Sequence, residues 1–391
     1  MKEKLLEAIR FFTRETQIMD GLTVVCGRRT AEGGFLSASA GEGRDIGERT
    51  LYDLASVTKI FTGLCLMRLR EEGKLDFSRR VTDYAPWFSH LGAVTVEQLA
   101  AFQVLLKTPE RIDRMPSPDQ ARQCLWETTC LGAPEGRAYS DIPAMVLKYV
   151  IEAAADEPFF ECVRRRVLEP AGLTETFAKV PEDRIGDCLL YGPEYRIEGE
   201  RWICRTDLRR GVPHDQKAAA IQGRSGDLCG HAGLFSTAAD LEKLAQALLS
   251  GRILRPESLA ALAVNRTGRQ KPDGTYTQYL GYLCYLKHPD QYFSEIPAYM
   301  SPAAFGIGGF TGNHFSVDPA TGRYTVFLGN RVRDRLTVLL PEAGKRRTDY
   351  GLQPDGRGGI QWTDGEWHPS SVDYVHQKDA HLHAVIETLF P

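Results

Sequence analysis

Residues 51–62 read LYDLASVTKIFT, in which a serine near the start of an apolar helical pattern is followed three residues later by a lysine. Residues i and i+3 lie on the same face of a helix, so the Ser56 hydroxyl and the Lys59 amine can share a hydrogen bond. The helix N-terminus adds partial positive charge, which favours an oxyanion that develops during acyl transfer. No other serine in the chain has a lysine at this spacing. The alternative interpretation is an N-capping serine beside an unrelated lysine.

Three later segments add to this pair. They are EGRAYSD at 135–141, GHAGLFST at 230–237 and FGIGGFTG at 305–312. Together with the Ser-x-x-Lys motif, and in this order, they resemble the serine β-lactamase and penicillin-binding protein superfamily, in its branch of class C-like esterases. The resemblance covers about residues 20–335 and the last helix.

The resemblance implies a β-lactamase/transpeptidase-like fold of the α/β (α+β) class, with a mainly antiparallel sheet flanked by helices. It predicts a discontinuous α/β domain formed by residues 1–75 and 225–391, and a mainly helical inserted domain at 76–224. The stretch from 335 to 370 has no counterpart in the family pattern, so we interpret it as an insertion.

Local patterns locate parts of the sheet and the helices. Strand-like runs at 21–27 and 34–40 flank a polar turn, and residues 313–330 form a second predicted hairpin. The helix that carries Ser56 is expected to end at Gly73, and the last helix is expected to span about residues 375–389.

The resemblance also assigns chemical roles. Ser56 would attack a carbonyl and form an acyl-enzyme, for which its hydroxyl needs a base. Lys59 is one candidate if burial lowers its pKa, and Tyr139 is the other. Because Asp141 near Lys59 would favour the ammonium form, we favour Lys59 as a cation that lowers the pKa of Tyr139, which then takes the proton. The backbone N–H groups of Ser56 and Phe310 would hold the oxyanion.

Histidines offer weaker signals. His231 would line the cleft in the family arrangement, or it packs at a tight turn. His214-Asp215 resembles a His-Asp pair of the esterase-like branch, or it is a loop contact. Three histidines near the C-terminus do not match a zinc-ligand spacing, and a solvated helix face is the favoured interpretation; they are His376, His381 and His383.

Departures from the family pattern point to a substrate. Ile307-Gly308-Gly309 stands where the third motif offers Lys or His, Thr and Gly. The cation and hydroxyl are missing, so a penicillin or a D-Ala-D-Ala terminus would lose its electrostatic anchor, and the second glycine would open extra room. Residues 100–106 would form an apolar cleft wall. We therefore expect a carboxylesterase-like serine hydrolase that acts on a small, uncharged and rather hydrophobic ester or amide.

Three alternatives stay open. The same site could serve an acyltransferase, because an apolar cleft lets an alcohol or amine capture the acyl group. It could serve a β-lactamase or a D-amino peptidase. A non-catalytic binding protein could keep the scaffold, although Ser56, Lys59 and Tyr139 are all present. No Gly-x-Ser-x-Gly elbow and no phosphate-binding loop occurs.

Composition narrows the setting. The chain has 391 residues, of which 42% are hydrophobic and 25% charged, with a formal net charge of -3. That charge gives no electrostatic case for nucleic acid or an anionic membrane. The nine cysteines lack Cys-x-x-Cys spacing, and the first residues lack the apolar core of a signal peptide. We expect reduced thiols, a cytoplasmic location and no cofactor; the sequence does not indicate an oligomeric state.

Overall fold

A six-stranded antiparallel sheet lies at the centre of the structure, a computed structural model that describes residues 1–390 apart from the side chains of residues 379 and 380. Its strand order is β2-β1-β12-β11-β10-β9, so the two ends of the chain build one sheet. Both predicted hairpins are confirmed as antiparallel strand pairs. The strands are β1 Gly21–Arg29, β2 Phe35–Gly43, β9 Tyr285–Leu286, β10 Phe305–Gly308, β11 His314–Asp318 and β12 Arg323–Gly329.

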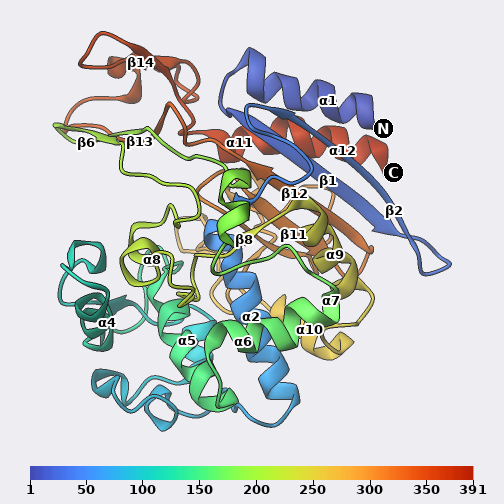
Figure 1. Ribbon diagram of the computed structural model, residues 1–391, viewed down its shortest axis with the longest axis vertical. Coiled ribbons are helices and arrows are strands. Elements are labelled where there is room, and N and C mark those ends of the chain that lie inside the picture. Colours follow the sequence, from blue (N-terminus) through green and yellow to red (C-terminus); the bar gives the residue numbers. More distant parts are fainter. Residues whose placement is uncertain (391) are drawn as a thin grey trace.

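Alternation along β1 separates the two faces of this sheet. Leu22 and Val24 pack with helix α1 (Lys2–Arg10) and the C-terminal helices. Val25 belongs to the larger core, which contains α2 (Thr58–Glu71) and α9 (Ala238–Leu249). Successive side chains of a strand point to opposite faces, which explains this division. Figure 1 shows α1 and α12 side by side over the sheet, so the two ends of the chain cover the same face.

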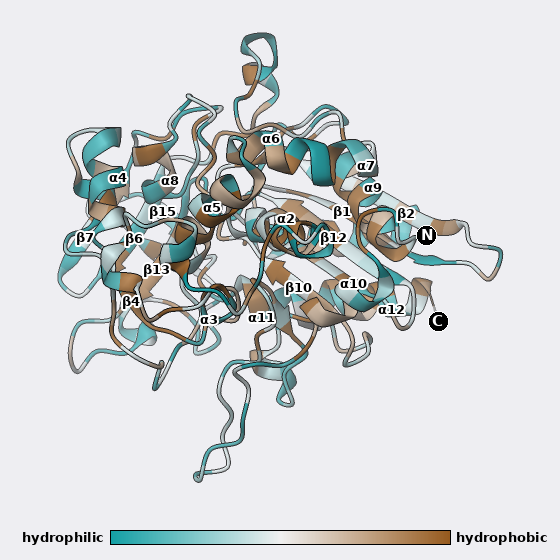
Figure 2. Ribbon diagram, turned by 90° about the horizontal axis from the view of Figure 1, so that it is seen from below, coloured by the Kyte–Doolittle hydropathy of each residue, from teal (hydrophilic) through white to brown (hydrophobic). Residues whose placement is uncertain are grey.

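Helix α2 (Thr58–Glu71) runs through the larger core and carries Lys59. Nearly every side chain from Thr58 to Leu69 is buried, as expected for a helix that is surrounded by protein. A short 3-10 helix, Ala55–Val57, precedes it and holds Ser56. The chain leaves the helix through Gly73, whose φ of +69° is left-handed, so the predicted end is confirmed. In Figure 2 hydrophobic colour gathers around α2 and the neighbouring strands, and the outer loops are largely hydrophilic.

A second, three-stranded sheet crosses the predicted domain boundary. Strand β6 (Glu194–Glu198) pairs with β7 (Arg201–Arg205) and, in parallel, with β13 (Arg335–Leu340). Residues 194–205, which lie within the part predicted to be mainly helical, contain two strands, and β6 joins them to β13 of the C-terminal part. The division into an α/β domain and an inserted domain stays a prediction.

The stretch 335–370 supplies β13 and a small hairpin beside it, and aromatic and aliphatic side chains hold these parts together. Leu336, Ile360 and Trp362 pack against Tyr195 and Ile197 of β6. The hairpin consists of β14 Gly359–Gln361 and β15 Trp367–Pro369, and Figure 1 shows it at the edge of the molecule.

The C-terminal helical stretch runs from Tyr374 to Leu389 and includes a π-helical turn. Its histidines do not form one solvated face. His383 is buried beside Phe327, and His376 stacks on Tyr292 at a ring distance of 3.9 Å. Among the helices of residues 1–390, none has both the length and the hydropathy of a membrane-spanning helix.

The remaining elements complete the two cores. The helices are α3 Val96–Ala100, α4 Pro118–Trp126, α5 Ile142–Ala155, α6 Phe159–Val163, α7 Glu169–Ala171, α8 Gln216–Ile221, α9 Ala238–Leu249, α10 Pro256–Leu262, α11 Tyr374–Lys378 and α12 Ala384–Leu389. The short strands are β3 Tyr52–Asp53 with β8 Phe235–Ser236, and β4 Leu106–Lys107 with β5 Thr129–Cys130.

Candidate active site

The Ser-x-x-Lys pair forms the contact expected of it. Nζ of Lys59 lies 3.0 Å from Oγ of Ser56 and 2.7 Å from Oδ1 of Asp141, and it also donates to the backbone carbonyl of His231. The Lys59 side chain is fully buried, whereas Ser56 is partly exposed. The structure thus brings the first and second motifs together around one amine.

Burial sets the protonation of this amine. It lowers the pKa of Lys59, and the nearby Asp141 carboxylate only partly offsets the effect. Burial acts on Asp141 in the opposite sense, but the positive charges of Lys59, His231 and Lys217 outweigh it and hold the pKa of the carboxyl group well below its usual range. A neutral amine next to an ionised carboxylate is therefore accessible here.

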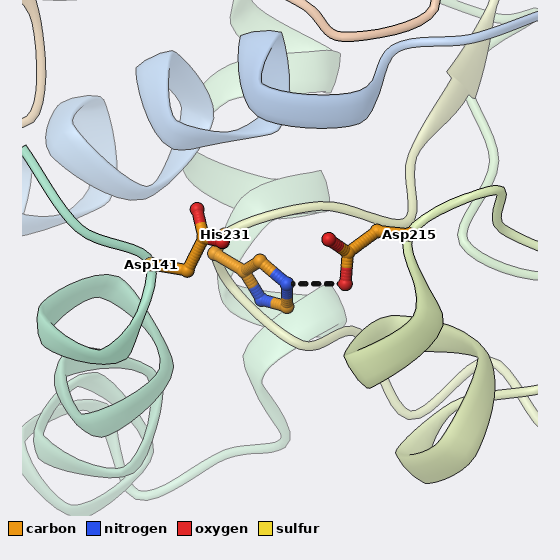
Figure 3. Close-up of side chains that lie close together, drawn as sticks. All are labelled: Asp141, Asp215 and His231. Carbon is orange, nitrogen blue, oxygen red and sulfur yellow. Dashed lines mark hydrogen bonds and ion pairs between the residues drawn. The ribbon is translucent and has the colours of Figure 1, made fainter. Parts of the chain in front are cut away.

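A second lysine shares the same carboxylate. Nζ of Lys217 lies 3.1 Å from Oδ2 of Asp141 and 3.4 Å from Oδ2 of Asp215. Nε2 of His231 is 2.9 Å from the other oxygen of Asp215, an interaction drawn in Figure 3.

Donor atoms of Asp141, Asp215 and His231 lie within 4.8 Å of one another, close enough to contact a common metal ion. Both carboxylates already contact lysine ammonium groups, and His231 is bound to Asp215. Lysines this close would repel a cation, so we interpret the cluster as an ion-pair network.

Tyr139 lies beside the same amine. Its ring lies 4.9 Å from Nζ of Lys59 and stacks on Tyr285 at 5.0 Å, and Gln278 accepts from its backbone N–H. Burial raises the pKa of Tyr139, the charge of Asp141 adds to the rise, and a hydrogen bond with Ser56 opposes it. The predicted lowering of this pKa is wrong, because Asp141 takes up the charge of Lys59 and the phenol is desolvated.

The two backbone N–H groups predicted to hold the oxyanion belong to residues at the cavity surface. Within the described part of the chain, neither the N–H of Ser56 nor that of Phe310 donates to a protein acceptor, although both residues line the cavity. The Asp53 side chain stabilises the turn before Ser56, because it accepts hydrogen bonds from the N–H groups of Ala55 (2.9 Å) and His214 (2.6 Å). Ala55 has a φ of +45°, which is unusual for a residue with a side chain.

A cavity of about 480 Å³ opens above Ser56. The apolar wall predicted at 100–106 does not line it, because Ala100, Ala101 and Phe102 are buried in the core. Its lining is strongly charged instead. The charged lining residues are Arg111, Asp113, Arg137, Asp141, Arg196, Arg205, Asp215, Lys217, Glu295 and Arg331.

The third motif differs from its prediction in two ways. The Ile307 side chain is completely buried in the core and does not reach the cavity, whereas Gly308 and Gly309 line it. The second glycine, Gly309, opens no extra room, because a Cβ there would lie 2.8 Å from the carbonyl oxygen of Leu54. A Cβ at Gly308 would lie 2.9 Å from Oε2 of Glu295. Lys378 of α11 holds that carboxylate at 2.8 Å.

Of the two histidines predicted near the site, His231 lies behind the cavity and His214 lines it. His231 is 1% exposed and does not line the cavity, so it supports Asp215 and does not contact substrate space. His214 does not pair with Asp215 through its side chain. Its Nε2 lies 2.9 Å from Oε2 of Glu194, and its ring stacks on Phe310 at 5.4 Å.

Comparison with known proteins agrees with this geometry. The family model described as Beta-lactamase matches residues 17–339. The chain belongs to the Beta-lactamase family. Proteins of this family are serine hydrolases, and so is this chain. The mainly antiparallel sheet flanked by helices is the fold predicted from the motifs.

Individual relatives of this Beta-lactamase family chain cover most of its length. A putative D-alanyl-D-alanine carboxypeptidase of Salmonella gallinarum is 27% identical over 72% of this chain and 69% of its own. EstCE1, a hydrolase with promiscuous acyltransferase activity, superposes with a TM-score of 0.65 and 19% identity over 84% of this chain and 93% of its own. A penicillin-binding protein homologue from Caulobacter crescentus superposes with a TM-score of 0.64 and 19% identity, over 86% of this chain and 93% of its own.

Several residues of the site escaped the family motifs. Lys217 follows Asp215 by two residues at the start of α8. This short spacing is the feature of the sequence that could have indicated Lys217 as a partner of Asp215. Glu295 lies in the loop before β10 and Arg331 follows β12, so only the fold brings them to the cavity.

Proposed function

We propose that the protein cleaves an ester or amide through an acyl-enzyme on Ser56, with Lys59 as the base. The observation that carries the proposal is the fully buried Lys59 amine, which lies 3.0 Å from the Ser56 hydroxyl. Burial lowers the pKa of this amine. A lysine amine becomes a useful general base when desolvation favours its neutral form.

Acylation follows from the contacts. Oγ of Ser56 bonds to the substrate carbonyl carbon while its proton passes to Nζ of Lys59. The carbonyl oxygen becomes an oxyanion and accepts from the N–H groups of Ser56 and Phe310. The bond to the leaving group then breaks, and the leaving atom receives the proton from Lys59 through the hydroxyl of Tyr139, which stays protonated because its pKa is raised.

Deacylation repeats the sequence with water. Water attacks the acyl carbon and gives a proton to Lys59, the bond to Oγ breaks, and Ser56 recovers its proton. One relative is named a putative D-alanyl-D-alanine carboxypeptidase, and one structural neighbour is named a hydrolase with promiscuous acyltransferase activity. These names support acyl transfer to water without selecting an ester or an amide. The charged lining does not favour the hydrophobic, uncharged substrate that the sequence suggested.

Labelling with a fluorophosphonate, followed by peptide mapping, tests the proposal. We expect one adduct on Ser56, and loss of both labelling and 4-nitrophenyl ester hydrolysis in Ser56→Ala. Ser250→Ala is the control, because Ser250 is exposed at the end of α9 and its Oγ only donates to Gln246. Wild-type turnover by Ser56→Ala, or an adduct elsewhere, would overturn it.

A further inference from the structure

The three-stranded sheet delivers arginines to the cavity above Ser56. Arg196 lies on β6 and Arg205 on β7, and Arg331 follows β12 just before β13. All three line the cavity beside Phe310. The guanidinium groups of Arg196 and Arg331 lie 5.3 Å and 4.4 Å from the centre of the Phe310 ring.

One carboxylate serves two of these arginines. Glu194 is fully buried, and its oxygens accept from Arg196 at 2.7 Å and from Arg205 at 3.0 Å. The same oxygens also contact His214 and the hydroxyl of Thr337. The acceptor positions of Glu194 are therefore filled, and its single negative charge balances only one of the two guanidinium groups.

Arg331 has no carboxylate at all within ion-pair distance in the described part of the chain. It is 7% exposed, and its Nε and Nη1 donate to the backbone carbonyls of Phe310 (2.6 Å) and Ser371 (2.8 Å). The other terminal nitrogen, Nη2, makes no hydrogen bond to a described residue. An arginine keeps its charge in proteins, so Arg331 is a buried cation to which the described residues give no counter-ion.

The other acidic groups that line the cavity are already paired. Asp113 binds Arg111, Asp141 and Asp215 bind lysines, and Glu295 binds Lys378. Three guanidinium groups against one carboxylate leave an excess of positive charge next to Phe310. Burial of a cation is costly unless an anion completes it, and a guanidinium binds carboxylate or phosphate oxygens in a fork.

We propose that this arginine site, formed by Arg331 with Arg196, binds an acidic group of the substrate. The inference rests on the proposed function, since it places the anion beside Phe310, whose N–H would hold the oxyanion. The substrate is then an ester or amide that carries a carboxylate or a similar oxyanion. The two arginines lie on β6 of the three-stranded sheet and in the segment between β12 and β13. They would take the place of the cationic residue that the family pattern has in the third motif, here on β10.

Matched substrates test this assignment and locate the acidic group. The first pair is 4-nitrophenyl hydrogen glutarate against 4-nitrophenyl pentanoate, with the charge on the acyl side. The second pair is 3-(butanoyloxy)benzoate against phenyl butanoate, with the charge on the leaving group. We expect kcat/KM to favour the anionic member of at least one pair, and Arg331→Gln to reduce that preference about 10- to 100-fold, mainly through KM.

Arg137→Gln is the matched control, because Arg137 lines the same cavity but is exposed, so its own charge is solvated and needs no anion. It should keep most of the preference. Equal kcat/KM for both members of both pairs in the wild type, or an equal loss in Arg137→Gln and Arg331→Gln, would overturn the arginine site.

Calorimetric titration gives a measurement that does not depend on turnover. Wild-type protein should bind glutarate and not glutaramide, and Arg196→Gln should weaken glutarate binding, which covers the case in which Arg331→Gln fails to fold. No fluorophosphonate adduct on Ser56 together with glutarate binding would refute the proposed function alone. An adduct without glutarate binding or anionic preference would refute the arginine site alone.

Discussion

The carboxylate of Glu295 occupies the space that a side chain at Gly308 would need, with Oε2 2.9 Å from the position of a Cβ. The third motif of the family pattern has a hydroxyl-bearing residue here. In this chain the loop before β10 supplies an acidic group instead, and Lys378 from the C-terminal helix fixes it.

Gly308→Ala should therefore lower the free energy of unfolding by about 1–3 kcal/mol, because the added methyl group forces the held carboxylate to move. Urea denaturation would measure the change. Gly136→Ala is the control, since a Cβ there meets no atom within 4 Å. Equal stability of the two variants would show that Glu295 yields without cost.

Substitution of the two candidate bases should separate their roles. Lys59→Met should lower kcat by about 10³-fold or more, because Lys59 is the one amine among the described residues that contacts Ser56. Tyr139→Phe keeps the ring stacked on Tyr285 and should cost about 10- to 100-fold, as expected for a proton relay. A larger loss of kcat in Tyr139→Phe than in Lys59→Met would indicate that Tyr139, and not Lys59, is the base.

Lys217 should act through Asp141 on Lys59. Its charge lowers the pKa of Lys59, which Asp141 and Asp215 raise, and His231 sits behind Asp215. Lys217→Met removes a positive charge, so the pKa of Lys59 should rise and the acid limb of the kcat/KM profile should move to higher pH, by about one unit. Activity at a fixed neutral pH should fall, because less of the amine is then neutral.

Lys217→Arg keeps the charge and should return the limb towards its wild-type position. The profile is measured from pH 5 to 10 with an ester substrate. A change in the height of the curve with no movement of the limb would mean that Lys217 only supports the structure.

Asp53 should be essential for the turn that presents Ser56. Asp53→Ala leaves the buried N–H groups of Ala55 and His214 without acceptors, and we expect a loss of about 2–4 kcal/mol in the free energy of unfolding together with a lower kcat. Asp53→Asn keeps one acceptor and should lie between the two proteins. Thermal unfolding and ester turnover check both effects, and a wild-type kcat in a destabilised Asp53→Ala would separate the turn from catalysis.

Local motifs predicted the parts of the site that depend on short spacing. Ser56 and Lys59 are one helical turn apart, so their contact follows from helix geometry alone. The hairpins 21–40 and 313–330 were also readable, because alternation and a turn define a strand pair.

Long-range contacts were beyond the motifs. The predicted apolar wall at 100–106 was wrong because apolar residues pack into a core as readily as they line a cleft. The charge of the cavity depends on Arg196 of β6 and Arg331 just before β13, which lie 135 positions apart in the chain and reach the same cavity through the pairing of β6 with β13. No periodicity or spacing in the sequence predicts that these two residues line one cavity.

The pairing of β1 with β12 also affects synthesis. The register joins Leu22 to Gly329 and Arg28 to Arg323. A nascent chain on the ribosome therefore holds its first hairpin with one edge unsatisfied until some three hundred further residues have been translated. We expect β1 to pair with β12 only late in translation or after it. Until then the exposed edge of the first hairpin should favour binding of chaperones.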